Sequence, residues 1–292
     1  MLARRLPGIL PPLEPEEALQ VTSVYSVSTR VPRPRGLLSR RPFRAPHHTI
    51  SSAALIGGGT NPQPGEVSLA HHGVLFLDEL TEFRRDVLEG LRQPLEDRTV
   101  TVARARSTLT FPSAFQMVAA ANPCPCGYLG DDKRECVCTP PAVERYRSRL
   151  SGPLLDRLDL QVTVPSVPWR ELAQDRRGET SEAVGARVAE ARRWARGRFG
   201  ADGPLSNGDM GSEAIREWAS PDDEGRRLLE HASRALGLSA RAWHRILRVA
   251  RTIADLAGDD GVAAPHVAEA IAYRALDRRS GLPPIGTLGA VK

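Results

Sequence analysis

Two adjacent carboxylates that follow an apolar run are the residues best suited to chemistry. Residues 73–79 read GVLFLDE, so a stretch of β-forming residues ends directly in Asp78 and Glu79. A continuously apolar run is typical of a strand buried on both faces of a parallel sheet, as a Walker B strand is. There Asp78 would hold Mg²⁺ through water, and Glu79 would polarise the water that attacks a γ-phosphate. The pattern predicts a phosphate-hydrolysing site.

The phosphate-binding loop that normally accompanies such a strand does not occur in these 292 residues. That loop reads GxxxxGK[ST], and its lysine reaches the phosphates. The chain has lysines only at Lys133 and Lys292, and neither follows a glycine. The sequence therefore carries half of a nucleotide site.

The elements after the apolar run should position a third polar residue. Apolar residues at helical spacing predict an amphipathic helix over 82–96, and alternation over 98–111 predicts a β-hairpin with its turn in ARARS. Residues 115–122, FQMVAAAN, read as a second buried strand that ends in Asn122. Ligands of open α/β sheets bind at the carboxyl ends of strands, so we expect Asp78, Glu79 and Asn122 to converge.

Four cysteines form a second candidate site. Cys124, Cys126, Cys136 and Cys138 are spaced C-x-C-x₉-C-x-C in a segment rich in Gly, Asp and Pro. Four thiolates can close a structural Zn²⁺ site, and they leave no open position for catalysis by the metal. Unliganded thiols and disulfides are the alternatives. The pairs His47-His48 and His71-His72 could suggest a metal site, but neighbours on a strand point to opposite faces, so each pair offers at most one ligand. We expect hydrogen-bonding or nucleotide-adjacent roles for them instead.

Composition is that of a globular protein, with 41% hydrophobic and 26% charged residues. No transmembrane segment or signal peptide is recognised, and four cysteines do not suggest a disulfide framework, so we expect a cytoplasmic protein. The net charge of +5 comes almost entirely from arginine, which suits phosphate contacts. A GC-rich genome that favours arginine is an equal explanation.

The chain divides into two predicted parts. Residues 1–165 hold short apolar runs and the candidate sites, and residues 166–292 show helical periodicity that predicts an all-α part. Within it, Ser220-Pro221 and Ser239 are predicted helix starts, and Gly237 and Gly258 are predicted helix ends.

Several segments in order resemble the ComM/YifB-type Mg-chelatase-like AAA+ family, which includes DNA helicases. They are RPFRAPHHTISSAALIGGG (41–59), PGEVSLAHHGVLFLDEL (64–80), LRQPLEDRTVTVARA (91–105), AAANPCPCGYLGD (119–131), SGPLLDRLDL (151–160) and LSARAWHRILRVARTIADL (238–256). The resemblance implies an α/β fold: an AAA+ P-loop-type core, here without its P-loop strand, followed by an all-α lid domain. It also implies ATP and Mg²⁺ as cofactors and a hexameric ring acting on DNA.

The resemblance assigns roles to individual residues. Asp78 and Glu79 match Walker B, Asn122 matches sensor 1, Arg157 matches the arginine finger, and Arg241 matches sensor 2. The alternatives are an ion pair of Arg157 with Asp156 or Asp159, and an ordinary solvated Arg241. Arg104 and Arg106 match the pre-sensor hairpin and could grip DNA phosphates, or they could belong to a solvated turn.

In relatives, MLARRLPGILPPL follows the GKT or GKS of the phosphate loop. We therefore expect a fragment of an ATP-dependent DNA motor that binds ATP weakly or not at all by itself. The alternatives are a magnesium-chelatase-type ATPase subunit and a non-enzymatic remnant that binds DNA or sibling subunits.

Overall fold

The computed structural model describes residues 2–59, 61–104, 107–131, 133–164, 178–200 and 203–274, with the backbone alone for Arg104 and Ser107. The chain divides into two compact units. The first comprises residues 1–157 and 165–188, and the second comprises residues 158–164 and 189–292. The boundary predicted between residues 165 and 166 lies outside the described residues.

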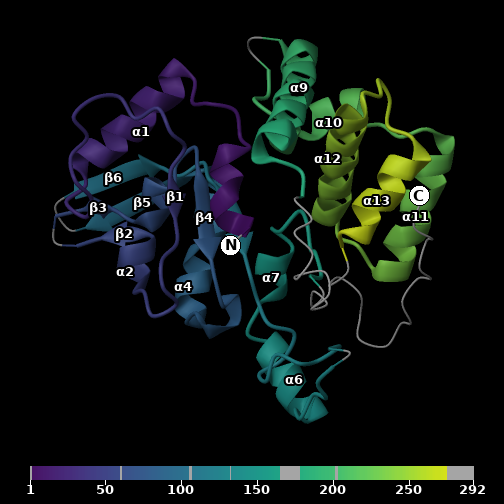
Figure 1. Cartoon of the computed structure of the whole chain (residues 1–292), viewed down its shortest axis with the longest axis horizontal. Helices are drawn as coiled ribbons and strands as arrows, with labels where there is room; N and C mark the ends of the chain where they lie inside the picture. Colours follow the sequence, from purple (N-terminus) through teal and green to yellow (C-terminus); the bar gives the residue numbers. More distant parts are fainter. Residues whose placement is uncertain are drawn as a thin grey trace. The chain divides into compact units, whose positions relative to one another are not determined.

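The first unit contains a three-stranded sheet (Figure 1). Strand β4 (Val74–Leu77) lies between β1 (Phe43–Arg44) and β7 (Gln116–Ala119), and it is parallel to both. Val74, Leu75 and Leu77 are fully buried, as the apolar run predicts. Strand β7 forms within the predicted range but is only partly buried, because it lies at one edge of the described sheet.

The first unit also contains helices before, between and after its strands. They are η1 (Leu2–Gly8), α1 (Pro15–Val27), α2 (Ser52–Leu55), α3 (Glu66–Leu69), η2 (Leu80–Glu82), α4 (Arg85–Gly90), α5 (Arg92–Asp97), α6 (Pro140–Arg147) and α7 (Gly152–Leu155). Helix α1 begins with a proline in its first turn, where no backbone N–H is needed. The side chain of Glu17 accepts the N–H of Glu14 at 3.0 Å, which caps the same end.

The prediction of one continuous helix over 82–96 is wrong. The segment instead forms η2, α4 and α5, with a break at Leu91. Pro94 accounts for the break, because it has no N–H to donate to the carbonyl of Gly90. The predicted apolar stripe nevertheless faces the core: Phe83, Val87, Leu88 and Leu91 are buried, and Leu95 packs against them.

The predicted β-hairpin is confirmed, and the structure adds its register. Strands β5 (Thr99–Arg104) and β6 (Ser107–Pro112) are antiparallel, and they pair Val100 with Phe111 and Val102 with Leu109. Val100, Val102 and Phe111 are buried, so the hairpin packs one face on the core of the first unit. A separate small pairing joins β2 (Gly57–Gly58) to β3 (Gln63–Pro64).

The second unit is helical, as the periodicity predicts. Its elements are the last residues of α9 (Ser181–Phe199), followed by η3 (Asn207–Asp209), α10 (Ser212–Trp218), α11 (Asp223–Leu236), α12 (Ala240–Ala257) and α13 (Ala264–Ala272). Ser239 caps α12 by accepting the N–H of Ala242, and Gly237 and Gly258 end their helices at positive φ. Helix α11 begins later than predicted, because Asp222 rather than Ser220 supplies the capping oxygen.

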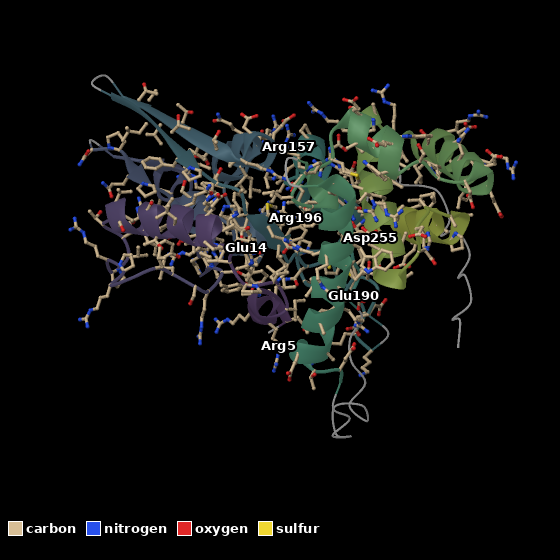
Figure 2. The ribbon with its side chains drawn as sticks, turned by 90° about the horizontal axis from the view of Figure 1, so that it is seen from above. Arg5, Glu14, Arg157, Glu190, Arg196 and Asp255 are labelled. Atoms are coloured by element: carbon tan, nitrogen blue, oxygen red, sulfur yellow. The ribbon has the colours of Figure 1, made fainter. Side chains whose placement is uncertain are left out.

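A buried carboxylate organises the polar interior of the second unit. Asp255 accepts hydrogen bonds from Arg198, Arg251 and Asn207, and Figure 2 labels it on α12. The side chains of Arg251 and Asp255 are each 1% exposed, so their charges must be compensated inside the unit. Among the described helices, none combines the length and the apolar character that a membrane crossing requires.

Candidate functional site

The two predicted hydrolytic carboxylates lie at the carboxyl end of β4. Asp78 and Glu79 directly follow the buried strand, and both residues are exposed. The chain after β7 is tied to this end, since the N–H of Leu80 donates to the carbonyl of Ala120 at 2.8 Å. Asn122 follows two residues later and is exposed. The structure therefore places Asp78, Glu79 and Asn122 at one edge of the sheet, as the strand order predicts.

The backbone at Glu79 has an unusual conformation for a residue with a side chain. Its φ is 53° and its ψ is 47°, in the left-handed region. Neighbouring groups hold it there: the Glu79 N–H donates to Asp78 Oδ1 at 3.0 Å, and the Glu79 carbonyl accepts the N–H of Glu82 at 2.7 Å. Such a conformation costs about 1–2 kcal/mol and is found where the fold sets the direction of a side chain.

A histidine contacts the Glu79 carboxylate. His48 Nδ1 lies 3.0 Å from Glu79 Oε2. The expectation that neighbouring histidines point apart is wrong. His47 and His48 lie in the loop after β1 and His71 and His72 in a turn before β4, and the ring centroids within each pair are 4.1 Å and 3.8 Å apart.

The four cysteines converge on one point. Their sulfur atoms all lie within 4.8 Å of one another, and the three separations among Cys124, Cys126 and Cys136 are 3.4, 3.6 and 3.7 Å. A tetrahedral Zn²⁺ site with Zn–S bonds of about 2.3 Å requires sulfur atoms about 3.8 Å apart. The backbone N–H of Tyr128 lowers the pKa of the Cys126 thiol to about 6, whereas the pKa values of Cys136 and Cys138 are raised, so of these three thiols only Cys126 favours the thiolate without a metal. The donor set and spacing therefore fit a structural Zn²⁺ ion.

The cysteine loop is joined to the carboxylate segment through α6. The loop begins after Asn122 and ends at α6, and Arg147 of α6 donates to the carbonyl of Pro123 at 3.3 Å. At the end of α6, the hydroxyl of Tyr146 is hydrogen-bonded to Thr81, three residues after Asp78. Residues of the loop, α6 and η2 together line a cavity of about 280 Å³.

The predicted arginines have different outcomes. The side chain of Arg157 is 11% exposed, and its guanidinium forms an ion pair with Glu96 of α5. Arg241 lies exposed in the first turn of α12, in the second unit. Arg104 ends β5 at the hairpin turn, and Arg106 lies outside the described residues.

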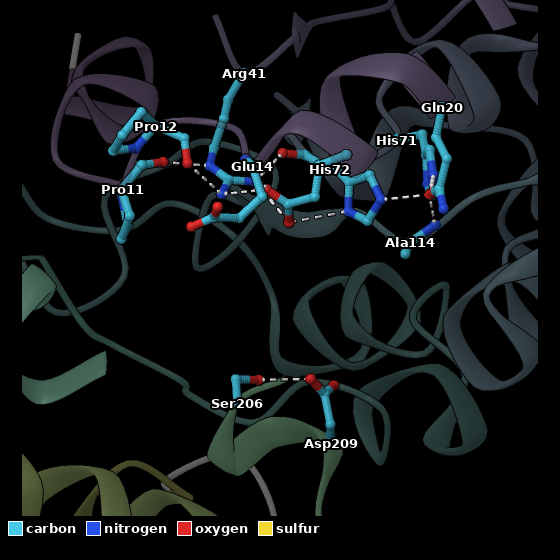
Figure 3. A network of polar contacts seen from close by, with 11 residues as sticks. Pro11, Pro12, Glu14, Gln20, Arg41, His71, His72, Ala114, Ser206 and Asp209 are labelled. Carbon is cyan, nitrogen blue, oxygen red and sulfur yellow. Dashed lines mark hydrogen bonds and ion pairs between the residues drawn. The ribbon is translucent and has the colours of Figure 1, made fainter. Parts of the chain in front are cut away.

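A polar network supports the turn that leads into β4 (Figure 3). Arg41 donates to the carbonyl of His72 at 2.8 Å and forms an ion pair with Glu17 of α1. Both neighbouring imidazoles contact Gln20 Oε1, and His71 Nδ1 accepts the N–H of Ala114, just before β7. Burial lowers the pKa of His71 to about 3, so its ring is neutral.

The sequence predicted a hydrogen-bonding or nucleotide-adjacent role for His48 but did not identify Glu79 as its partner, and it did not single out Glu96. The sequence gives only a weak signal for the position of His48, because β1 has only two residues and lacks an apolar run that would predict a strand. A strand beside β4 places its following loop at the same sheet edge, but local periodicity does not predict which strands are neighbours in a sheet.

The chain is similar to known proteins over nearly its whole length. The magnesium chelatase subunit ChlI family matches residues 1–172, and the C-terminal family of the same subunit matches residues 178–274. The chain is 47% identical over 280 residues to competence protein ComM of Haemophilus influenzae, covering 95% of this chain and 53% of that protein. It is 45% identical over 280 residues to YifB of Escherichia coli, with 95% and 54% covered. The chain thus spans about half the length of the curated relatives it matches.

The two magnesium chelatase family models match consecutive parts of the chain, and the sequence identity to ComM extends over nearly all of it. The parallel sheet of the first unit and the helical second unit are consistent with it. The chain belongs to the ComM/YifB-type Mg-chelatase-like AAA+ ATPase family.

Proposed function

We propose that this chain supplies the hydrolytic part of an ATP-dependent DNA motor. The observation that carries the proposal is the position of Asp78 and Glu79 at the end of β4, beside the continuation of β7 that holds Asn122. Carboxylate and amide groups gathered at this edge suit the water and the metal ion of phosphoryl transfer. The family relationship supports the same reading.

The residues present fit the cofactors that the family implies. Asp78 and Glu79 offer exposed carboxylate oxygens, the ligand type that Mg²⁺ prefers. When bound, the ion would neutralise charge on the phosphates. Asp78 would hold the ion, Glu79 would polarise the attacking water, and Asn122 would position that water. Arg157 would act on ATP in a neighbouring subunit, and Arg241 would sense nucleotide from the helical unit.

The phosphate cradle is the missing component of the proposed site. No GxxxxGK[ST] motif occurs in the 292 residues, so we propose that another polypeptide segment supplies it. This chain by itself should then bind and hydrolyse ATP weakly or not at all. An in-frame GKT or GKS in the DNA upstream of the codon for Met1 would identify that segment.

ATP turnover tests this function. We expect a protein that includes the upstream GKT or GKS to hydrolyse ATP. In that protein Glu79→Gln should lower kcat by about 10²-fold or more, because the attacking water loses its general base. Glu82→Gln is the matched control, since Glu82 is an exposed neighbour that pairs with Arg149. Equal effects of the two substitutions, or full turnover by the 292-residue chain alone, would contradict the proposal.

DNA is the proposed substrate of the motor, and a hexameric ring its assembled form. Arg104 ends β5 of the hairpin, and Arg106 follows two residues later in the sequence, before β6. Arginines at such a position can contact phosphates without reading bases. The relative named as a competence protein supports a role in natural transformation. For the four-cysteine cluster we propose a structural Zn²⁺ ion that fixes the loop between Asn122 and α6.

A further inference from the structure

The chain between α1 and β1 carries a concentration of positive charge. Residues 18–65 contain six arginines and no Asp or Glu, whereas the whole chain has 40 Lys and Arg against 35 Asp and Glu. Five of the six arginines lie in residues 29–41, which read TRVPRPRGLLSRR and are called the basic segment below. Like charges at this density repel one another, so the partners of each arginine decide what the segment can bind.

Three of the six arginines are engaged inside the first unit. Arg30 donates to two backbone carbonyls near the end of α2, at 3.3 and 3.5 Å. Arg41 forms an ion pair with Glu17 at 2.9 Å, and Arg44 forms one with Glu66 at 2.6 Å. The fold therefore already uses these three guanidinium groups, and both carboxylates come from outside residues 18–65.

The remaining three arginines of this range, Arg33, Arg35 and Arg40, are exposed. None of them forms a hydrogen bond or an ion pair with any residue that the structure describes. Such an arginine can offer its planar fork to a phosphate without first breaking an internal contact. The basic segment thus presents three uncompensated cations on the surface of the first unit.

The basic segment is fixed to the first unit at both ends. At its start, the N–H of Thr29 donates to Oε1 of Gln63 in β3 at 3.0 Å. Near its end, the N–H of Leu38 donates to the hydroxyl of Thr22 in α1 at 3.0 Å. The exposed arginines are therefore carried by a stretch of chain whose ends are held in place before any partner binds.

Two prolines stiffen the stretch between these anchors. Pro32 and Pro34 fix their own φ, and each restricts the residue before it to extended conformations, so Arg33 is constrained from both sides. The Cα atoms of Arg33 and Arg35 are at most about 7 Å apart. Phosphates of one DNA strand follow at about 3.4 Å along the helix axis, so both side chains can reach the same short stretch of backbone. A stiff segment also loses less conformational entropy on binding.

The chemistry of the basic segment favours nucleic acid over a membrane surface. Segments that bind membrane surfaces combine basic residues with an apolar face of Trp, Phe or Leu on a helix. Residues 29–41 contain no aromatic residue and form no helix, and only Leu37 among their large apolar side chains is strongly exposed, at 64%. Arginine forks without an apolar face match a phosphate backbone.

We propose that the basic segment is a second DNA-contact surface, on which Arg33, Arg35 and Arg40 bind backbone phosphates. The proposal rests on the proposed function, since it takes DNA as the substrate of the motor, and it adds a surface outside the hairpin of β5 and β6. Phosphate contacts carry no sequence information, so this surface holds DNA of any sequence.

Salt-dependent binding to the 292-residue chain tests the proposal. Fluorescence anisotropy with labelled duplexes of two unrelated sequences gives the slope of log affinity against log salt. We expect the pair Arg33→Ala and Arg35→Ala to reduce this slope by about 2, and Arg40→Ala to reduce it by about 1, equally for both sequences. The pair Arg226→Ala and Arg227→Ala on α11 is the matched control: it removes the same charge from two exposed arginines and should leave the slope unchanged.

A variant that keeps the charge separates phosphate contacts from effects on the fold. Arg33→Lys with Arg35→Lys retains two cations and should retain the slope. The urea midpoint of the double alanine variant should equal that of the wild type, because neither arginine contacts a partner in the described part of the chain. An equal loss of slope in the lysine and alanine variants, together with a lower urea midpoint, overturns the proposal, since unfolding of the segment would then be responsible.

The other outcomes separate this inference from the proposed function. A slope in Arg33→Ala with Arg35→Ala that equals the slope of the α11 control overturns the inference and leaves the function intact. The inference also fails if this variant loses binding to vesicles of phosphatidylserine while its DNA slope is unchanged, because the segment then serves a membrane. A wild type that binds no DNA at any salt concentration contradicts both the inference and DNA as the substrate, whereas ATP turnover of Glu79→Gln still tests the hydrolytic role.

Discussion

Arg157 forms an ion pair with Glu96 inside the first unit. The guanidinium lies against the Glu96 carboxylate of α5, and it also donates to the carbonyl of Pro153 at 2.7 Å. The two acidic residues considered as partners from sequence were close neighbours in the chain, and one of them, Asp159, binds Arg245 instead. The proposed arginine finger is therefore held by its own chain, and it must leave Glu96 before it can reach a neighbouring subunit.

Replacing Glu96 should separate stability from activity. In the isolated chain, Glu96→Gln should lower the free energy of unfolding by about 1 kcal/mol or less, because Glu96 is 47% exposed and solvent screens the pair. In the assembled protein we expect the same substitution to raise ATP turnover a few-fold, and Arg157→Ala to lower it by about 10³-fold. Urea unfolding and ATPase rates measure these effects. Glu89→Gln, which breaks the ion pair with Arg92, is the control. If Glu96→Gln turns over ATP no faster than this control, Arg157 does not need to be released from Glu96.

The His71 imidazole should make stability depend on pH. Burial lowers its pKa from 6.5 to about 3, so the unfolded chain binds a proton that the folded chain does not. Stability from this group is complete above pH 6.5 and falls toward pH 3, by about 1.4 kcal/mol per pH unit. In His71→Asn, which keeps an acceptor for the Ala114 N–H, urea unfolding between pH 7.5 and 5 should show a smaller slope. The exposed His231, changed to Asn, should keep the wild-type slope.

The four-cysteine cluster should contain one Zn²⁺ per chain. Elemental analysis of protein purified without added metal should detect it, and Cys124→Ser should lose it because Cys124 is the buried member of the set. Loss of the metal should lower the free energy of unfolding by at least about 2 kcal/mol, since the loop has little core of its own. EDTA already saturated with zinc controls for effects of the chelator. A metal-free native chain of undiminished stability, or one with disulfides, would rule out this assignment.

Gly73 should be intolerant of any side chain. A Cβ there would lie 2.1 Å from the carbonyl oxygen of Pro42, and this oxygen accepts the N–H of Val74 at 2.8 Å to align β4 with β1. We expect Gly73→Ala to lower the free energy of unfolding by about 2–4 kcal/mol in thermal or urea denaturation. Gly36→Ala is the control, because nothing lies within 4 Å of its added Cβ. Similar stabilities of the two variants would show that β1 and β4 can separate at no cost.

The hairpin arginines should contribute non-specific DNA contacts. If each binds one phosphate, Arg104→Ala and Arg106→Ala should each reduce the slope of log affinity against log salt by about 1. Fluorescence anisotropy with duplexes of two unrelated sequences should show the same reduction for both. Arg85→Ala, an exposed arginine on α4, should leave the slope unchanged. Unaltered slopes in both hairpin variants would place the DNA elsewhere.

Elements whose signals are local were predicted well. The strand before Asp78, the hairpin over 98–111 and the caps of α12 all agree with the structure. Each depends on residues close in sequence: alternation, an apolar run, or one side chain bonding a backbone group three positions away. The break at Leu91 was missed because the apolar stripe continues across it, although Pro94 interrupts the backbone hydrogen bonds.

The sequence by itself determined which groups are available: two carboxylates after a buried strand, an asparagine after the next predicted strand, and four cysteines within one loop. Local hydrogen bonding and periodicity are enough to specify these. Only the tertiary structure decided their partners, since Glu79 meets His48 across two parallel strands and Arg157 meets Glu96, 61 residues earlier in the chain. Sheet order and packing bring these residues together, and no spacing along the chain encodes which loop will face a given carboxylate.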